Sequence, residues 1–148
     1  MKVVVSASEG EETRAARDWC AANLHEDDEV IAVVGTNQVG EFVLGAPPLD
    51  SINGAQFDLI EAAQREVCVP LTSVGVACTS RLVRHTQGRA VVQVAREEHA
   101  DLIVVGKYPH GSFADAVLGE VATQLAHRPP CPLVIVPVGA ASVLHSSG

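Results

Sequence analysis

A glycine-containing loop within residues 104–122 holds the residues best suited to chemistry. Its sequence, VVGKYPHGSFADAVLGEVA, begins as a buried strand that ends at Gly106 and restarts as a helix just after Gly119. Glycines let a backbone approach a ligand closely, and the N–H groups at a helix start can hold an anion. The spacing therefore indicates a candidate phosphate-binding loop.

Two residues in this loop oppose a bound phosphate. Pro109 has no N–H group and fixes its own φ angle, so a donor and a flexible position are lost together. Glu120 puts a carboxylate in the first helical turn, either as a helix-capping acid or as an internal mimic of the missing phosphate. Two like charges about 4 Å apart repel by about 4 kcal/mol at an effective dielectric constant near 20, which is roughly a thousandfold in affinity. Both interpretations of Glu120 oppose ATP.

Other residues near the loop keep two interpretations each. Lys107 and His110 are either solvated loop residues or counter-charges for a phosphate, and Tyr108 either covers the pocket or stacks on a base. Gly106 and Gly119 either allow a strand and a helix to pack closely or line an active pocket. Ser8 fits the N-cap of the first helix, with Glu11 completing a capping box.

Continuous apolar runs predict the strands that position this loop. They alternate with helical segments along the whole chain, which is typical of a parallel sheet covered on both faces. The predicted strands are 2–7, 29–35, 71–78, 101–106 and 131–138. No change of composition divides the chain, so we expect one domain over 1–138 and a loosely held tail over 139–148.

Helical periodicity fills the segments between the strands. The first helix is predicted over about 9–23, with Trp19 in the core rather than serving as a ligand platform. The second runs from about residue 53 to Pro70, with a buried stripe of Phe57, Ile60, Ala63 and Val67. Thr86 caps a third helix that ends near residue 99 and turns Val91, Val94 and Ala95 inward. Helical segments over 112–118 and 120–128 follow, and 36–52 is an irregular connection.

The carboxyl ends of parallel strands are where ligands bind in such sheets. The candidate nucleotide pocket therefore combines the ends of the first, second and fourth predicted strands with the glycine loop. Its residues are Ala7, Ser8, Glu9, Val34, Val105, Gly106, Lys107, Pro109, His110, Gly119, Glu120, Val121 and Ala122.

Charge and composition exclude several classes of function. A net charge of −8 argues against a nucleic-acid partner, because neutralising phosphates needs clustered Lys and Arg. The apolar runs are too short for a membrane helix and no signal peptide or anchor is visible, so we expect no membrane partner. Four scattered cysteines, Cys20, Cys68, Cys78 and Cys131, fit buried thiols, and the six histidines form no metal motif. No nucleophile elbow, P-loop or dinucleotide fingerprint occurs, so no catalytic residue is expected.

The last predicted strand carries apolar residues on both faces. If this strand lies at a sheet edge, its unpaired backbone groups would pair with other chains unless a partner covers them. We therefore expect a homodimer interface at Leu133, Val134, Ile135 and Val136. The alternative is a strand buried under its own helices, with its edge protected by the tail.

Three of these segments together resemble the universal stress protein domain. They are ADLIVVG at 100–106, a glycine thirteen positions after Gly106, and PCPLVIVP at 130–137. The nucleotide signature of that family is G-x-x-G-x9-G-[ST], and this chain has Pro109 at the middle glycine and Glu120 at the hydroxyl position. Where nucleotide-binding members have Asp followed by Gly-Ser after the first strand, alignment on Trp19 places Ser8, Glu9 and Gly10.

The resemblance implies an α/β fold and a regulatory function. The fold is a three-layer α/β/α arrangement around an open five-stranded parallel sheet of order 3-2-1-4-5, Rossmann-like and adenine nucleotide alpha hydrolase-like. It also implies a small cytoplasmic protein that dimerises through its last strand. We expect a degenerate pocket without a cofactor. We also expect the protein to act by association with other proteins, which include a second copy of the chain and a further protein partner. The alternatives are a member that binds ATP, AMP or a cyclic nucleotide, and a slow nucleotide hydrolase.

Overall fold

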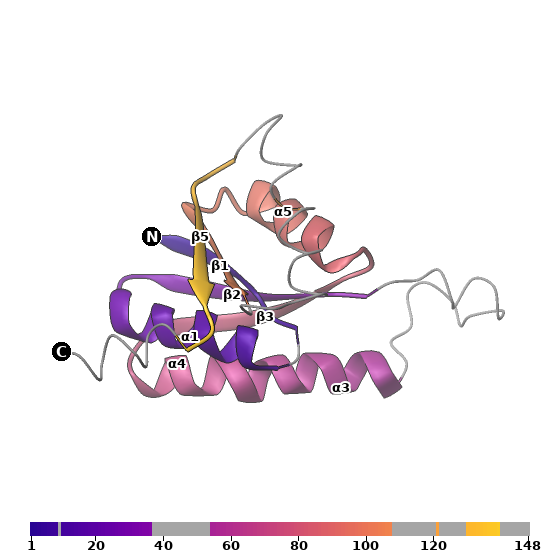
Figure 1. The fold of residues 1–148 in the computed structure, drawn as a ribbon, viewed down its shortest axis with the longest axis horizontal. Helices are drawn as coiled ribbons and strands as arrows, with labels where there is room; N and C mark the ends of the chain where they lie inside the picture. The colour runs from indigo at the N-terminus through magenta and orange to yellow at the C-terminus, as the bar shows by residue number, and fades with distance from the viewer. Residues whose placement is uncertain (9, 37–53, 108–120, 122–129, 140–148) are drawn as a thin grey trace, which may run out of the picture.

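The computed structural model describes residues 1–8, 10–36, 54–107, 121 and 130–139. Within them a five-stranded parallel sheet runs in the order β3-β2-β1-β4-β5 (Figure 1). Its strands are β1 (Lys2–Ser6), β2 (Glu29–Gly35), β3 (Ala77–Val83), β4 (Leu102–Lys107) and β5 (Leu133–Pro137). The predicted strand order is confirmed.

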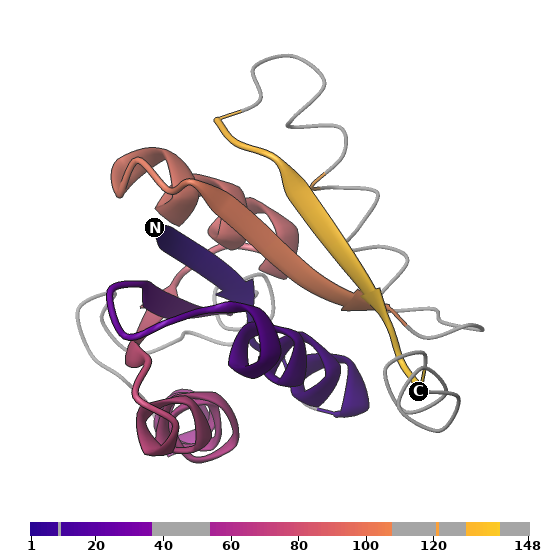
Figure 2. The ribbon, with the colours of Figure 1, turned by 90° about the vertical axis from the view of Figure 1, so that its left-hand side faces the viewer.

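Helices cover both faces of this sheet, which makes three layers (Figures 1 and 2). One face carries α1 (Glu11–Asn23) and a continuous helical segment made of α3 (Gly54–Ala63), the π-helical turn η1 (Gln64–Cys68) and α4 (Val69–Ser73). The other face carries α5 (Gln87–Glu97). No helix among the described residues is long and apolar enough to cross a membrane.

Successive residues of the central strands place their side chains alternately in two separate hydrophobic cores. In β1, Val3 and Val5 face the α1 side, whereas Val4 faces the α5 side. All three are fully buried, because a parallel strand in the middle of a covered sheet has no solvent face. This explains why continuous apolar runs, and not alternating ones, predicted the central strands. Trp19 packs against the α1-side core, as expected.

The prediction that a strand occupies 71–78 is wrong. The helical segment continues past Pro70 to Ser73, and β3 begins only at Ala77. Pro70 lies in the first turn of α4, directly after the wide turn of η1. Pro70 has no N–H to donate to the preceding turn, and Arg17 Nη1 instead donates to the carbonyl oxygen of Glu66, four residues earlier, at 3.0 Å. The π-helical turn also widens the backbone here, so the helix passes through the proline.

Gly75 marks the actual end of this helix. Its φ angle of 89° is in the left-handed region, and its N–H donates to the carbonyl oxygen of Thr72 at 3.0 Å. The N–H of Val76 reaches back to the carbonyl oxygen of Leu71 at 3.0 Å, and both of these side chains are buried. These two bonds and the apolar contact are those of a Schellman motif.

The predictions for the second and third helices are partly correct. Phe57 was expected in the buried stripe of the second helix, but 58% of it is exposed and Gln56 is buried beside it. The stripe is therefore wrong at its start, and correct at Ala63 and Val67. The third helix turns Val91, Val94 and Ala95 inward as predicted. Most of the 36–52 connection, nearly all of the last helical segments and the tail beyond Gly139 lie outside the described residues.

Candidate functional site

The carboxyl ends of β1, β2 and β4 meet at one edge of the sheet. The N–H of Ala7 donates to the carbonyl oxygen of Val33 at 2.9 Å, so the ladder between β1 and β2 continues one residue past β1. The structure places six of the predicted site residues at this edge, namely Ala7, Ser8, Val34, Val105, Gly106 and Lys107. The side chains of Ala7, Val34 and Val105 are buried in the cores, so only their backbones are available there to a ligand.

Gly106 is in close contact with the first turn of α1. A Cβ atom at this position would lie 2.6 Å from the carbonyl carbon of Glu12 and 2.8 Å from its Cα, closer still to its oxygen. These atoms are backbone and cannot rotate away. The passage of strand and helix therefore requires a glycine at 106, whether or not a ligand binds.

The start of α1 differs from the prediction. Gly10, not Ser8, holds the N-cap position, with a φ angle of 109° that suits only glycine well, and the helix begins at Glu11. The carbonyl oxygen of Ser8 accepts a hydrogen bond from the Thr13 hydroxyl. The predicted capping box is wrong, because the N-cap lies two residues later than Ser8, at Gly10, and no side chain makes a capping hydrogen bond there.

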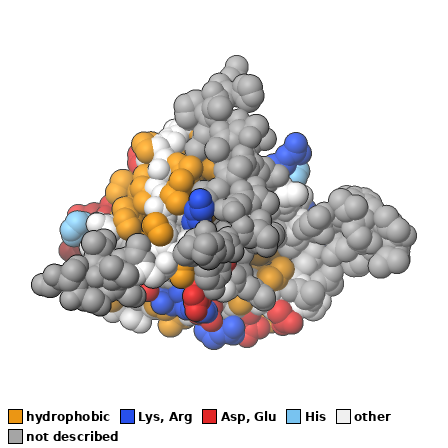
Figure 3. All heavy atoms as spheres, in the orientation of Figure 1, with side chains coloured by type: hydrophobic (Ala, Val, Ile, Leu, Met, Phe, Trp, Pro, Cys, Tyr) orange, Lys and Arg blue, Asp and Glu red, His pale blue; other side chains and the backbone are white. Residues whose placement is uncertain are grey.

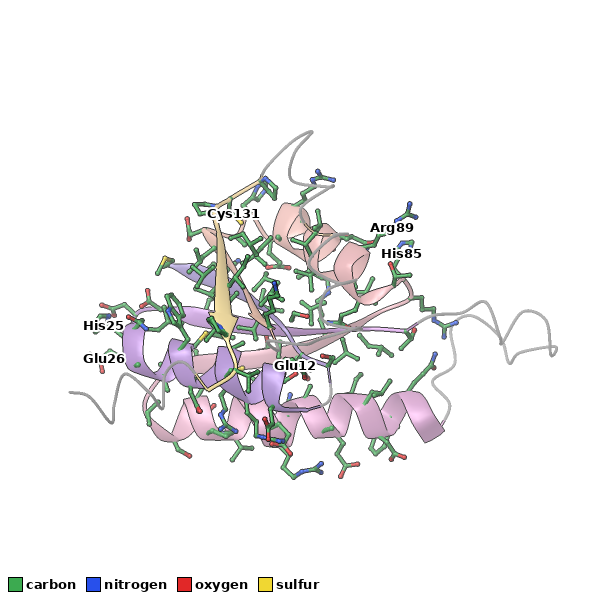
Figure 4. All side chains as sticks on the ribbon, in the orientation of Figure 1. Glu12, His25, Glu26, His85, Arg89 and Cys131 are labelled. Carbon is green, nitrogen blue, oxygen red and sulfur yellow. The ribbon has the colours of Figure 1, made fainter. Side chains whose placement is uncertain are left out.

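The first turn of α1 is acidic. Glu11 and Glu12 both lie there, and the Glu12 carboxylate folds back over Gly10, with Oε2 2.7 Å from the place of a Cβ atom. Figure 4 shows Glu12 at the start of the helix. Carboxylates in this position are stabilised by the positive end of the helix dipole. Because these carboxylates already lie at the positive end of the helix dipole, an anionic ligand would gain less stabilisation there.

Gln87 is a buried residue of this edge that no sequence pattern singles out. Its Oε1 accepts the N–H of Gly35 at 2.7 Å, and its Nε2 donates to the Ser6 Oγ at 3.0 Å and to the carbonyl oxygen of Val33 at 2.8 Å. One amide side chain on α5 thus ties together the carboxyl ends of β1 and β2. The partners are far apart in the sequence, so no local pattern identifies them.

A surface hollow of about 370 Å³ lies beside the edge, between α1 and the end of β5. It is lined by Glu11, Arg14, Ala15, Arg17, Asp18, Pro137, Val138 and Gly139. Its arginines are already neutralised, because Arg17 pairs with Asp18 at 2.9 Å and Arg14 lies 3.9 Å from a Glu66 carboxylate oxygen. In the described part of the chain, this hollow offers little unpaired positive charge to a phosphate.

The remaining predicted site residues divide into two groups. Val121 is described and fully buried, with its side chain in the core on the α5 side. The others, Glu9, Pro109, His110, Gly119, Glu120 and Ala122, lie outside the described residues, as does Tyr108. Across the described ranges, no group of three or more His, Cys, Asp or Glu residues is arranged to hold a metal ion.

Comparison with known protein families identifies the family of this chain. Residues 1–137 match the universal stress protein family. The chain belongs to that family. The resemblance of its fourth and fifth strands to the universal stress protein domain is therefore confirmed.

A related sequence supports the assignment over part of the chain. A universal stress protein of a Synechocystis strain is 25% identical over 65 residues, which are 44% of this chain and 60% of that protein. The match therefore spans less than two thirds of the relative's length.

Solved universal stress proteins share the fold along nearly the whole chain. One in complex with cAMP has a TM-score of 0.60 at 20% identity, over 93% of this chain and 97% of its own. One from Archaeoglobus fulgidus in complex with dAMP has a TM-score of 0.65 at 14% identity, over 91% and 95% of the two chains. A third, from Arabidopsis thaliana with AMP bound, has a TM-score of 0.59 at 15% identity, over 95% and 94%.

The last strand of this universal stress protein lies at a sheet edge. Ile135 is 48% exposed and Leu133 and Val134 are half-buried, whereas Val136 is only 5% exposed and belongs to the core on the α1 side. Figure 3 shows hydrophobic side chains gathered over β5. Of the four residues predicted for a dimer interface, Ile135 is thus the most exposed to a partner, whereas the side chain of Val136 is buried.

Proposed function

We propose that this universal stress protein is a homodimeric regulatory protein whose nucleotide pocket is degenerate and does not hold ATP tightly. It acts by association with other proteins and not by chemical turnover. The observation that carries the proposal is the acidic first turn of α1, whose backbone at Glu12 lies directly against Gly106 of β4.

The charges around the pocket favour weak binding of a triphosphate. Glu11 and Glu12 lie at the sheet edge where the phosphates would approach, and the sequence adds Glu120 in the phosphate signature itself. Pro109 removes one backbone donor from the same signature. Repulsion between like charges grows with ligand charge, so ATP suffers more than a nucleoside monophosphate.

A second candidate function is binding of an adenosine monophosphate. It is favoured by the relatives, which were crystallised with cAMP, dAMP and AMP. A ligand with one phosphate needs fewer donors from the loop, and adenosine could rest on the backbones of Ala7 and Val34. Titration with AMP and ATP side by side separates the two candidates.

Replacing Glu120 by serine is expected to raise the affinity for ATP at least tenfold, and Pro109→Gly in addition should raise it further. The first change removes a negative charge and restores the hydroxyl of the family signature, and the second restores a donor. Isothermal titration calorimetry measures both. Glu26→Ser is the matched control, because it removes the same charge in the turn beyond the opposite end of α1 (Figure 4).

Two results would contradict the degenerate pocket. A wild-type dissociation constant for ATP below about 10 μM would show that the pocket works as it stands. No gain in either variant would show that charge and the missing donor are not the obstacle.

Replacing Ile135 by glutamate is expected to convert the dimer into monomers. A charge on the exposed face of an edge strand opposes the pairing that would cover it. Val136 is unsuitable for this test, because a charge there would enter the core. Val69→Glu, at a 59% exposed position on α4, is the control that should remain dimeric. Sedimentation velocity gives the oligomeric state, and a monomeric wild type would end the dimer proposal.

A further inference from the structure

Two cysteines that lie ten residues apart in the sequence meet where η1 packs against β3. The Sγ atoms of Cys68 and Cys78 are 2.7 Å apart. This is only about 0.7 Å longer than a disulfide bond of about 2.05 Å. A small rotation of either side chain would bring the sulfurs to bonding distance.

The surrounding fold holds these two cysteines in register. Gln64, one helical turn before Cys68, donates from its Nε2 to the Oγ of Ser80 at 2.8 Å. Residues four apart share a helix face and residues two apart share a strand face, so Gln64 and Cys68 lie over Ser80 and Cys78. The Schellman turn at Gly75 reverses the chain between them. The meeting of the sulfurs is thus set by the backbone on both sides.

The two thiols have different surroundings. Cys68 is 2% exposed, whereas Cys78 is partly exposed on β3, which is an edge strand. The Cys78 thiol donates a hydrogen bond to the Cys68 sulfur, which lowers the pKa of Cys68 against the opposing effect of burial and raises the pKa of Cys78. Burial raises the pKa of Cys20 to about 12 and also raises the pKa of Cys131. The contact lets one thiol of the pair stabilise a thiolate on the other, and the partial exposure of Cys78 opens the pair to solvent.

We propose that Cys68 and Cys78 are a reversible oxidation site that forms an intrachain disulfide when the protein meets a hydroperoxide. One sulfur of the pair, as its thiolate, attacks the peroxide oxygen; the O–O bond breaks, an alkoxide or hydroxide departs and takes up a proton, and the attacking sulfur becomes a sulfenic acid. The other sulfur then attacks the sulfenic sulfur, its proton goes to the departing hydroxyl group, and water is released. Two thiols lose two electrons in all, and a hydroperoxide is reduced to an alcohol and water, or hydrogen peroxide to two waters.

The site is separate from the candidate nucleotide pocket. Cys78 pairs with Val30 near the amino end of β2, whereas the pocket lies at the carboxyl end of the sheet. The disulfide would join an edge strand to the helical layer and close a short loop. Such a cross-link restricts the unfolded chain and stabilises the fold.

Alkylation of the full-length protein tests the proposal directly. Trypsin should release both cysteines in one peptide, residues 66–81, because Arg65 and Arg81 flank them. After treatment with hydrogen peroxide, denaturation and iodoacetamide, this peptide is expected to carry no alkyl group and to have lost two hydrogens. Chymotrypsin, cleaving after Leu71, should leave two fragments joined through sulfur. Reduction with dithiothreitol should restore two alkylation sites.

Variants and stability decide between the possible pairings. Cys78→Ser should abolish the linkage, and Cys20→Ser should leave it intact. The oxidised wild type should melt roughly 5–10 °C higher than the reduced protein, a difference that dithiothreitol removes. Two alkyl groups on peptide 66–81 after peroxide, or a linkage of either cysteine to Cys20 or to a second chain, would overturn the proposal.

Discussion

Replacing Gly106 by alanine is expected to lower the free energy of unfolding by about 3 kcal/mol. The new methyl group would lie 2.6 Å from the carbonyl carbon of Glu12, so α1 would have to move away from β4. Helix α1 also packs its Ala16 and Cys20 side chains into the core, so a shift at its first turn spreads to these contacts. Urea unfolding followed by Trp19 fluorescence measures the change, since this tryptophan lies on the displaced helix.

Gly54→Ala is the matched control for this experiment. Gly54 begins α3, and a Cβ atom there meets nothing within 4 Å. Its unfolding free energy should stay within about 1 kcal/mol of the wild type, or rise, because alanine favours a helix more than glycine does. If Gly106→Ala were as stable as Gly54→Ala, the close passage of β4 and α1 would not be the reason for the glycine.

The strands were predictable because burial on both faces leaves a strong local signal. The second strand was expected over 29–35 and is observed at Glu29–Gly35. The fourth and fifth differ from their predictions by one or two residues at each end. Continuous apolar runs bounded by turn residues are sufficient for the central strands β1, β2 and β4, whose side chains are buried on both faces of the sheet.

The helix through Pro70 was not predictable from the same rules. Proline ends most helices, and the π-helical turn that accommodates it leaves no simple mark in the sequence. Gly75 was the better signal, because a helix end in the left-handed region favours glycine. A prediction that weighed both residues would have placed β3 later.

The candidate site was predictable in its position and not in its contacts. The ends of parallel strands converge at one edge, so Ser8, Val34 and Gly106 could be grouped from the sequence. The packing of Gly106 on Glu12 joins distant parts of the chain and left no local pattern. The same is true of the sulfur contact between Cys68 and Cys78, which were expected to be ordinary buried thiols.

Replacing Gln87 by glutamate is expected to lower the free energy of unfolding by at least 3 kcal/mol at pH 7. The amide group donates to the carbonyl oxygen of Val33 at 2.8 Å and to the Ser6 hydroxyl at 3.0 Å. A carboxylate has no proton for these bonds and would place a charge in a site that is 7% exposed. It would also direct an oxygen at the Val33 carbonyl oxygen.

The loss should depend on pH in a defined direction. Burial would raise the pKa of the new carboxyl group in the folded protein above its unfolded value of about 4.3. The destabilisation relative to wild type is therefore smallest below about pH 4 and grows as the pH rises through the folded pKa. Gln93→Glu, on the outer part of α5 where Gln93 bonds to the exposed Glu97, makes the same change of charge and should cost less than about 1 kcal/mol. Equal losses in the two variants, or a loss at Gln87 that is constant with pH, would mean that the three bonds of Gln87 do not hold β1 and β2 together.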